Sequence, residues 1–180
     1  MNGPLVAHST VHADDRGDFL EWFKLKDLQT AIGTEINFTQ GNISRSHSKV
    51  LRGIHYSTSP LGQSKWVTCM NGRILDYVID LRVGSPTFKQ WEEIEIKGMQ
   101  GVAIYIPQGF GHAFLSMEED SLVSYLVSSD FDPLAEKAIN PFDQDISLKF
   151  PFKDLVISEK DVNAPSLKAQ QALDLLPREI

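Results

Sequence analysis

A histidine and an arginine stand close together in a mostly apolar stretch of this sequence. Residues Val50–Thr58 read VLRGIHYST and contain Arg52 and His55. The alternation in this stretch predicts a β-strand, and both side chains are costly to bury there without a partner. An imidazole titrates near neutral pH and can move protons, and a guanidinium pairs well with phosphate oxygens. A lone buried histidine is more often a core residue, but the pair indicates a polar site on the strand.

A second histidine, His112, closes a spaced motif. Residues 101–112 read GVAIYIPQGFGH, with glycine, proline, glycine and histidine at the spacing of the second cupin motif. This spacing suits a strand, a Pro-Gly turn and a next strand whose histidine points inward. The stretch therefore resembles a cupin, which implies a jelly-roll barrel.

The metal site of many cupins is not reproduced here. Their first motif has two histidines one residue apart and then a glutamate. In this chain Ser57 follows His55 at that spacing, and no Glu lies between His55 and Gly72. A transition metal usually needs at least three protein ligands, and Cys69 is the only cysteine. We therefore expect neither a metal nor another cofactor.

The elements that must position these side chains are mainly strands. Asn71-Gly72, between two apolar runs, predicts a β-hairpin. Short helices are predicted only for Lys24–Ala31 and Pro165–Leu175. With strands and turns alternating about every ten residues, we expect an all-β protein, a cupin-like double-sheet jelly roll with short peripheral helices, as a single domain over residues 1–180. The expected strands include Trp66–Met70, Arg73–Leu81, Trp91–Ile96, Val102–Ile106 and Leu122–Ser128.

Charge and composition limit the classes of function. The net charge of −7 argues against a nucleic-acid binder. No apolar run approaches the roughly 20 residues of a membrane span, and the first residues lack the pattern of a signal peptide. We expect a cytoplasmic protein with no membrane partner. His8, His12 and His47 are expected at the surface, and the acidic run Glu118–Asp120 is expected to be a solvated hairpin tip.

Segments along nearly the whole chain resemble the dTDP-4-dehydrorhamnose 3,5-epimerase family and its antibiotic-sugar relatives. The resemblance implies a metal-free jelly-roll homodimer that acts on a nucleoside-diphospho-4-keto-6-deoxyhexose by removing and returning a proton at C3, C5 or both. The nucleotide expected from the resemblance is dTDP. The segments that carry it are Asp15–Phe19, Phe38–Asn42, Val50–Tyr56, Gln63–Lys65, Asp76, Ser85–Phe88, Ile106–Phe114, Asn140–Asp143 and Leu155–Asp161.

The resemblance also implies a role for each catalytic residue. His55 is the base that takes a proton from carbon, and Asp161 orients it. Lys65 stabilises the negative charge that develops on the C4 oxygen. Tyr125 donates a proton from the opposite face, and Asp76 lies near the histidine and the lysine.

Substrate-binding residues follow from the same resemblance. Arg16 and Arg52 hold the diphosphate. His112 lies near the sugar. Phe19 and Glu21 come from the partner subunit, because the family exchanges N-terminal strands. The nucleotide and sugar pocket is formed by these two residues together with Gln40 and Asn42.

Two departures from the family pattern concern the nucleotide end. Rhamnose-pathway members carry a tyrosine pair shortly after the catalytic tyrosine, the first of which stacks on thymine. Asp130 and Phe131 occupy these positions, so we expect the stacking aromatic to be lost. Stacking of a base on an aromatic side chain can contribute about 1–3 kcal/mol to binding. Ile43 replaces a usual histidine.

Two other functions remain open on the sequence. One is a single-site epimerase or a ketoisomerase of the same family, which uses similar enolate chemistry. The other is a non-catalytic cupin that binds a sugar nucleotide. The set of His55, Lys65, Tyr125 and Asp161 argues against the non-catalytic cupin, since a pure binder needs no base.

Overall fold

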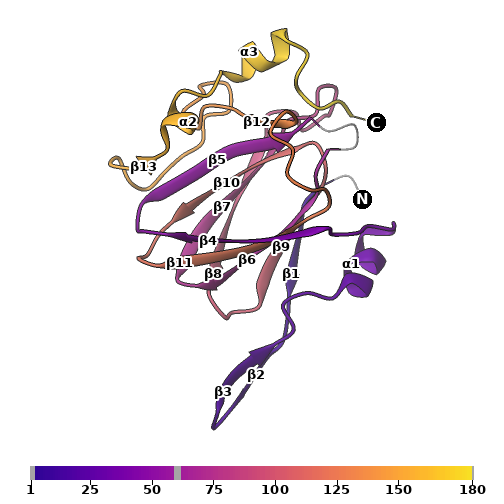
Figure 1. Cartoon of the computed structure of the whole chain (residues 1–180), viewed down its shortest axis with the longest axis vertical. Coiled ribbons are helices and arrows are strands. Elements are labelled where there is room, and N and C mark those ends of the chain that lie inside the picture. Colours follow the sequence, from indigo (N-terminus) through magenta and orange to yellow (C-terminus); the bar gives the residue numbers. More distant parts are fainter. Residues whose placement is uncertain (1–2, 59–61, 180) are drawn as a thin grey trace.

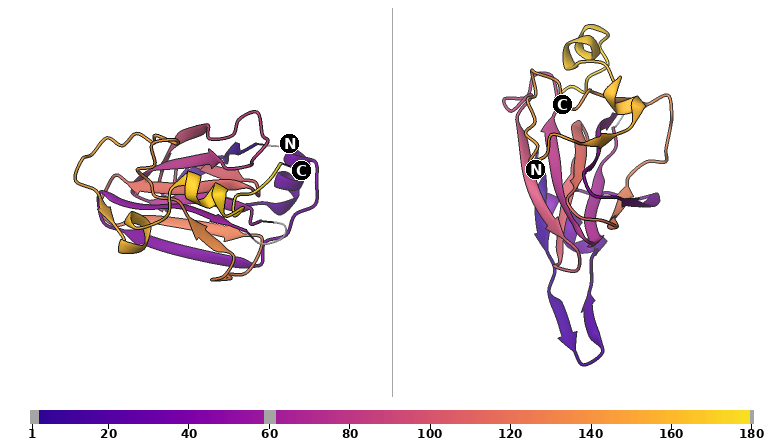
Figure 2. Two further views of the ribbon diagram at one scale, coloured as in Figure 1. Left: turned by 90° about the horizontal axis from the view of Figure 1, so that it is seen from above. Right: turned by 90° about the vertical axis from the view of Figure 1, so that its left-hand side faces the viewer.

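Two sheets pack face to face in this computed structural model, which describes residues 3–58 and 62–179. The first is antiparallel, in the order β1 (Leu5–His8), β9 (Val102–Ile106), β6 (Lys65–Asn71), β11 (Ser121–Val127) and β4 (Gln40–Ser46). The second has the order β12 (Glu136–Ala138), β5 (Val50–Ser57), β10 (Phe110–Ser116), β7 (Arg73–Asp80) and β8 (Trp91–Lys97), and β13 (Val156–Ile157) runs parallel to β5. Figure 1 shows the sandwich, and Figure 2 shows its two layers edge-on.

The core between the sheets is built from side chains that alternate along the strands. Val67, Ile104 and Val123 of the first sheet pack against Ile74 and Val78 of the second. Burial of this apolar surface is the main force that holds the two sheets together. The all-β double-sheet prediction is confirmed.

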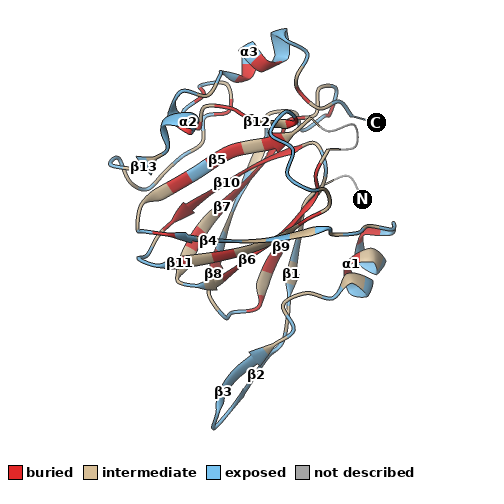
Figure 3. Ribbon diagram, viewed as in Figure 1, coloured by how far each residue is buried: buried red, intermediate tan, exposed pale blue. Residues whose placement is uncertain are grey.

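The outer face of the second sheet is also covered, which explains the long apolar runs in its strands. The C-terminal segment with α2 (Glu159–Val162) and α3 (Leu167–Ala172) lies over β5, β10 and β7 (Figure 1). Leu167 and Ile139 pack there against Leu51 and Tyr77. Every residue of β10 is consequently buried (Figure 3). A strand that is covered on both faces loses the polar alternation of a half-exposed strand.

Helix α1 (Leu25–Ile32) covers the first sheet with Leu28 and Ile32 against Trp66. It lies one residue from the predicted position, whereas α3 is shorter than the predicted Pro165–Leu175. In the part of the chain that the structure describes, no helix combines the length and the apolar character that a membrane crossing requires.

The predicted hairpin at Asn71-Gly72 is wrong. Strands β6 and β7, on either side of it, belong to different sheets. Gly72 adopts the left-handed conformation, with φ 76°, that the dipeptide favours. The local turn was therefore recognisable, but the choice of neighbouring strand depends on the packing of the whole sandwich.

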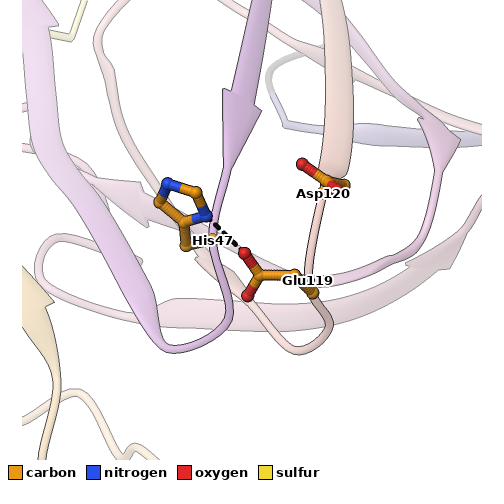
Figure 4. Close-up of side chains that lie close together, drawn as sticks. All are labelled: His47, Glu119 and Asp120. Carbon is orange, nitrogen blue, oxygen red and sulfur yellow. Dashed lines mark hydrogen bonds and ion pairs between the residues drawn. The ribbon is translucent and has the colours of Figure 1, made fainter.

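The acidic run has the predicted exposure but not the predicted connection. Glu118, Glu119 and Asp120 are exposed and join β10 to β11, which lie in different sheets. His47 on the β4–β5 turn pairs with Glu119 (Figure 4). Asp120 lies 3.7 Å from Arg45. These are solvated surface contacts, which contribute little to stability.

A separate two-stranded hairpin extends away from the sandwich. It consists of β2 (Val11–Asp14) and β3 (Gly17–Leu20), and Figures 1 and 3 show it projecting as an exposed arm. Phe19 on this arm is 64% exposed. An exposed aromatic on an unsupported hairpin indicates a surface that binds something else.

Candidate active site

A cavity of about 260 Å³ opens between the two sheets and gathers most of the predicted site residues. Its walls come from β4 and β11 of the first sheet and from β5 and β10 of the second. The predicted residues that line it are Gln40, Asn42, Arg52, His55, Lys65, His112 and Tyr125.

Strand β5 brings both Arg52 and His55 to this cavity through an irregularity. Residues three apart on a regular strand point to opposite faces of the sheet. Here the register with β10 shifts between the pairs His112–His55 and Phe114–Arg52. Gly53 lies at this shift with φ 115°, and a Cβ there would lie 2.5 Å from the carbonyl oxygen of His112. The position therefore requires glycine, and the bulge re-aims the strand so that both side chains face the site.

His55 is held from behind by Asp161. The Nε2 atom of His55 lies 2.7 Å from Oδ1 of Asp161, which is buried on α2. Ser158 caps the N-terminus of this helix, and its hydroxyl accepts a hydrogen bond from the Asp161 N–H at 3.1 Å. Burial raises the pKa of Asp161, but hydrogen bonds, above all from His55, outweigh it and hold the pKa below its ordinary value. Because Nε2 faces the carboxylate, Nδ1 is the ring nitrogen left for a substrate.

A second histidine–aspartate pair lies beside the first. His112 Nε2 is 2.7 Å from Oδ2 of Asp76, which is fully buried on β7. His112 and His55 are direct neighbours in the β10–β5 register. Asp76 is thus bonded to the second histidine, while His55 is paired with Asp161. The other carboxylate oxygen of Asp76 has no hydrogen-bond partner within the described chain.

Lys65 reaches the cavity from the start of β6. It is 7% exposed, and its Nζ donates to Oε1 of Gln63 at 2.5 Å. Burial lowers the pKa of Lys65, with an opposing contribution from Glu136. A buried ammonium next to a developing anion interacts more strongly than one in water.

Tyr125 faces the cavity from the sheet opposite His55. It lies on β11, whereas His55 lies on β5. Burial raises the pKa of Tyr125, Glu136 raises it further, and Arg52 lowers it. The phenol is therefore protonated at neutral pH and can donate a proton.

Three further polar side chains, those of Arg52, Gln40 and Asn42, line the cavity. Arg52 donates to Oγ of Ser46 at 3.1 Å and to the carbonyl of Arg45. It forms no ion pair with a carboxylate in the part of the chain described, so its charge is available to a phosphate. Gln40 donates to Asn42 Oδ1 at 2.7 Å, and both face inward because β4 alternates between half-buried and exposed positions. Ile43 is on the outer face and 70% exposed, so that departure lies away from the cavity.

Three predicted binding residues are not brought to this cavity within one chain. Arg16, Phe19 and Glu21 lie on or next to the projecting hairpin and are exposed. Arg16 pairs with Asp14 and Glu21 with Lys24.

The cavity also contains residues that the sequence analysis did not assign to the site. Phe131 lines it, and its N–H donates to Oε1 of Gln40 at 3.0 Å. An aromatic ring therefore lines the cavity next to Gln40, although Asp130 replaces the expected one. The remaining additions are Gln63, Ser44, Phe114, Val127, Glu136 and Lys160. Strand alternation could have found several additions, because they stand two residues from a predicted one: Gln63 from Lys65, Ser44 from Asn42, Phe114 from His112 and Val127 from Tyr125. Lys160 is next to Asp161, whereas Glu136 on β12 has no such neighbour.

Comparisons with known proteins agree with this geometry. The model of the family described as dTDP-4-dehydrorhamnose 3,5-epimerase matches residues 1–169. A dTDP-4-dehydro-6-deoxyglucose 3-epimerase from Streptomyces bikiniensis is 40% identical over 98% of this chain and 91% of its own length. A dTDP-4-dehydrorhamnose 3,5-epimerase from Mycolicibacterium smegmatis is 40% identical over 93% of this chain and 83% of its own.

Solved structures give the same result. ChmJ, a 3'-monoepimerase from Streptomyces bikiniensis in complex with dTDP-quinovose, superposes with a TM-score of 0.93 and 38% identity over 98% of this chain and 89% of that chain. The sequence match, the superposition and the site geometry lead to one conclusion. The chain belongs to the dTDP-4-dehydrorhamnose 3,5-epimerase family.

Proposed function

We propose that this protein epimerises a dTDP-linked 4-keto-6-deoxyhexose at C3, C5 or both, through an enolate. The observation that carries the proposal is the placement of His55 and Tyr125 on opposite walls of one cavity that also contains the buried Lys65. Inversion at carbon needs a base on one face of the sugar and an acid on the other. The names of the relatives support a dTDP sugar as substrate.

The reaction begins at the carbon next to the ketone. Nδ1 of His55 takes its proton, the C–H bond breaks, and the electron pair moves into the enolate. Asp161 stabilises the imidazolium that results. The Lys65 ammonium stabilises the charge on the C4 oxygen. The Tyr125 hydroxyl then gives its proton to the opposite face of the same carbon, and solvent restores both residues to their starting protonation states.

The same cavity orients the nucleotide. Arg52 binds the diphosphate, because a guanidinium pairs with two phosphate oxygens at once. Gln40 and Asn42 bind the nucleoside, and Phe131 provides the stacking surface for the base. The His112–Asp76 pair positions the sugar.

The projecting hairpin is the proposed contact between subunits of a homodimer. In this arrangement Arg16, Phe19 and Glu21 serve the cavity of the partner, which agrees with their exposure and with their distance in the fold from their own cavity. Sedimentation analysis tests this directly. We expect a dimer that dissociates when residues 11–20 are replaced by a short Gly-Ser turn, and a wild-type monomer would contradict it.

Proton exchange tests the function itself. The enzyme is incubated with dTDP-4-keto-6-deoxyglucose in D₂O and the product is followed by NMR. Deuterium with inversion at C3 and C5 identifies a 3,5-epimerase, and label with inversion at one carbon identifies a single-site enzyme. Absence of exchange with dTDP, GDP and CDP sugars would overturn the proposal in favour of a non-catalytic binder. Movement of the carbonyl to C3 would identify a ketoisomerase.

A further inference from the structure

The ammonium of Lys65 is held by an uncharged partner. Its Nζ donates to Oε1 of Gln63 at 2.5 Å. No carboxylate of residues 3–58 or 62–179 forms an ion pair with Lys65. Lys65 is nonetheless buried in a cavity that also contains Glu136. A buried ammonium usually pairs with a carboxylate, so a neutral amide as its hydrogen-bond acceptor is unusual.

Gln63 is itself fixed in one orientation. It is 8% exposed, and its Nε2 donates to the carbonyl of Ser129 at 3.0 Å and to its hydroxyl at 3.3 Å. Because the amide NH₂ group faces these acceptors, the amide oxygen must point to the other side, where Lys65 lies.

The backbone around Gln63 is joined to the same segment. The Ser64 N–H donates to the Ser128 hydroxyl at 2.9 Å, and the Ser128 N–H donates to the Ser64 carbonyl at 3.1 Å. Two consecutive residues of one segment are thus tied to two of the other, so the amide of Gln63 cannot shift without breaking several hydrogen bonds.

We infer that Gln63 is a positioning residue that holds the Lys65 ammonium at the cavity wall without neutralising its charge. This inference rests on the proposed function and deepens it, because it explains how the lysine remains available to the C4 oxygen. A carboxylate at position 63 would form an ion pair with Lys65, and the field that the ammonium exerts on the enolate would be cancelled. An apolar side chain would leave the ammonium without its acceptor.

The pKa of Lys65 is a measure of this role, and the groups around Lys65 determine in which direction each substitution of Gln63 shifts that pKa. The charged and titratable groups that share the cavity are Arg52, His55, His112, Tyr125, Glu136 and Lys160. Burial lowers the pKa of Lys65, and Glu136 opposes this. Replacing Gln63 by glutamate adds a negative charge beside Nζ, so the pKa rises. Replacing it by methionine removes a hydrogen bond to the charged form, so the pKa falls further.

The experiment compares Gln63→Glu, Gln63→Met and the surface control Gln100→Glu. The Lys65 side-chain nitrogen is titrated by ¹⁵N NMR without substrate, and kcat and KM for exchange are measured against pH. We expect opposite shifts of the lysine pKa in Gln63→Glu and Gln63→Met. We also expect kcat to fall at least tenfold in both with little change in KM, and the Gln100→Glu variant to match wild type.

The results separate this inference from the proposed function. A wild-type enzyme that exchanges no proton overturns the function, while the substrate-free titration still decides the Gln63–Lys65 coupling. The inference is overturned by a lysine pKa that is the same in wild type, Gln63→Glu and Gln63→Met, or by variants that lose only thermal stability. Gln63→Met also decides the question if Gln63→Glu does not fold, since the predicted fall in pKa and kcat is specific to a lost acceptor.

Discussion

Two buried aspartates on strand β7 have very different surroundings. Asp80 is 2% exposed and accepts hydrogen bonds from Arg82, Ser85 and Thr87, with side-chain distances of 2.6 to 2.9 Å. Asp76 is fully buried, but only one of its oxygens has a partner in the described structure, and that partner is His112 at the cavity. The hydrogen bonds of Asp80 stay within a local network, whereas the hydrogen bond of Asp76 holds a side chain that lines the cavity.

The comparison teaches which buried charges belong to stability and which to chemistry. Around Asp80 every strong donor comes from the same short segment, Asp80–Thr87, so the cluster is complete without a ligand. The His55–Asp161 and His112–Asp76 pairs each leave one face of an imidazole in the cavity. A fully satisfied hydrogen-bond network, as around Asp80, stabilises the fold. A histidine–aspartate pair that keeps part of its imidazole in a cavity can still bind or exchange a proton with another molecule.

The largest expected effect is at His55. In His55→Asn we expect deuterium exchange to fall about 10²–10⁴-fold, because the base is lost, while the melting temperature changes little. NMR exchange rates and thermal unfolding check this. The matched control is His47→Asn, since His47 also contacts a carboxylate but lies on the surface. Equal exchange rates in the two variants would contradict our assignment of the base.

Tyr125→Phe separates proton removal on one face of the sugar from proton donation on the other. We expect inversion to fall about 10²-fold or more, because the donor on the second wall is gone. Exchange continues, since His55 can return a deuteron to the face from which it took the proton. NMR of the recovered sugar measures label and configuration together. Loss of label and inversion in equal proportion would show that Tyr125 acts before or during proton removal.

Asp80→Asn tests the structural side of the comparison. We expect the free energy of unfolding at pH 7 to fall by about 3 kcal/mol, because Arg82 loses a buried partner. The kcat of the folded fraction stays at the wild-type value. Urea unfolding and kinetics measure the two quantities, and a variant of full stability and low kcat would assign Asp80 to the chemistry.

The lowered pKa of Asp80 predicts how the free energy of unfolding depends on pH. Burial raises the pKa of Asp80, but its donors outweigh this and lower the pKa to about 2, from 3.8 in the unfolded chain. A lowered pKa stabilises the fold above pH 3.8, and this stabilisation of about 2 kcal/mol is lost as the pH falls toward 2. The difference in stability between wild type and Asp80→Asn is therefore expected to narrow over this range. A constant difference between pH 7 and pH 2 would contradict the lowered pKa.

The smallest expected effect is at Phe131. This side chain lines the cavity but is 61% exposed, so we expect Phe131→Ala to raise KM about tenfold at nearly constant kcat. The matched control is Leu134→Ala, an exposed apolar residue of the same loop that does not line the cavity. A KM that stays at the wild-type value in Phe131→Ala would show that the base does not stack there.

The sequence predicts the scaffold better than the contacts that complete the site. An apolar run between Gly101 and Pro107 gives the strand Val102–Ile106 at its observed bounds, and the spacing up to His112 places that side chain at the cavity. Asp161 follows only from the family resemblance, because its partner His55 is more than a hundred residues away. Glu136 was missed because only the pairing of β12 with β5 brings it to the cavity. Phe131 was noted only as a departure from the family pattern, and its place in the cavity depends on a hydrogen bond to the distant Gln40. Local pattern cannot specify such long-range contacts.

The bulge at Gly53 has a consequence for what a single strand can do. An extended strand has two sides, and strict alternation would point only one of Arg52 and His55 into the cavity. The one extra residue of the bulge at Gly53 lets both side chains point to the cavity. In the proposed function, the groups that bind the phosphate and the sugar then lie on one short peptide. The distance between these two groups is therefore fixed by the backbone of one strand and does not depend on the conformations of two independent loops.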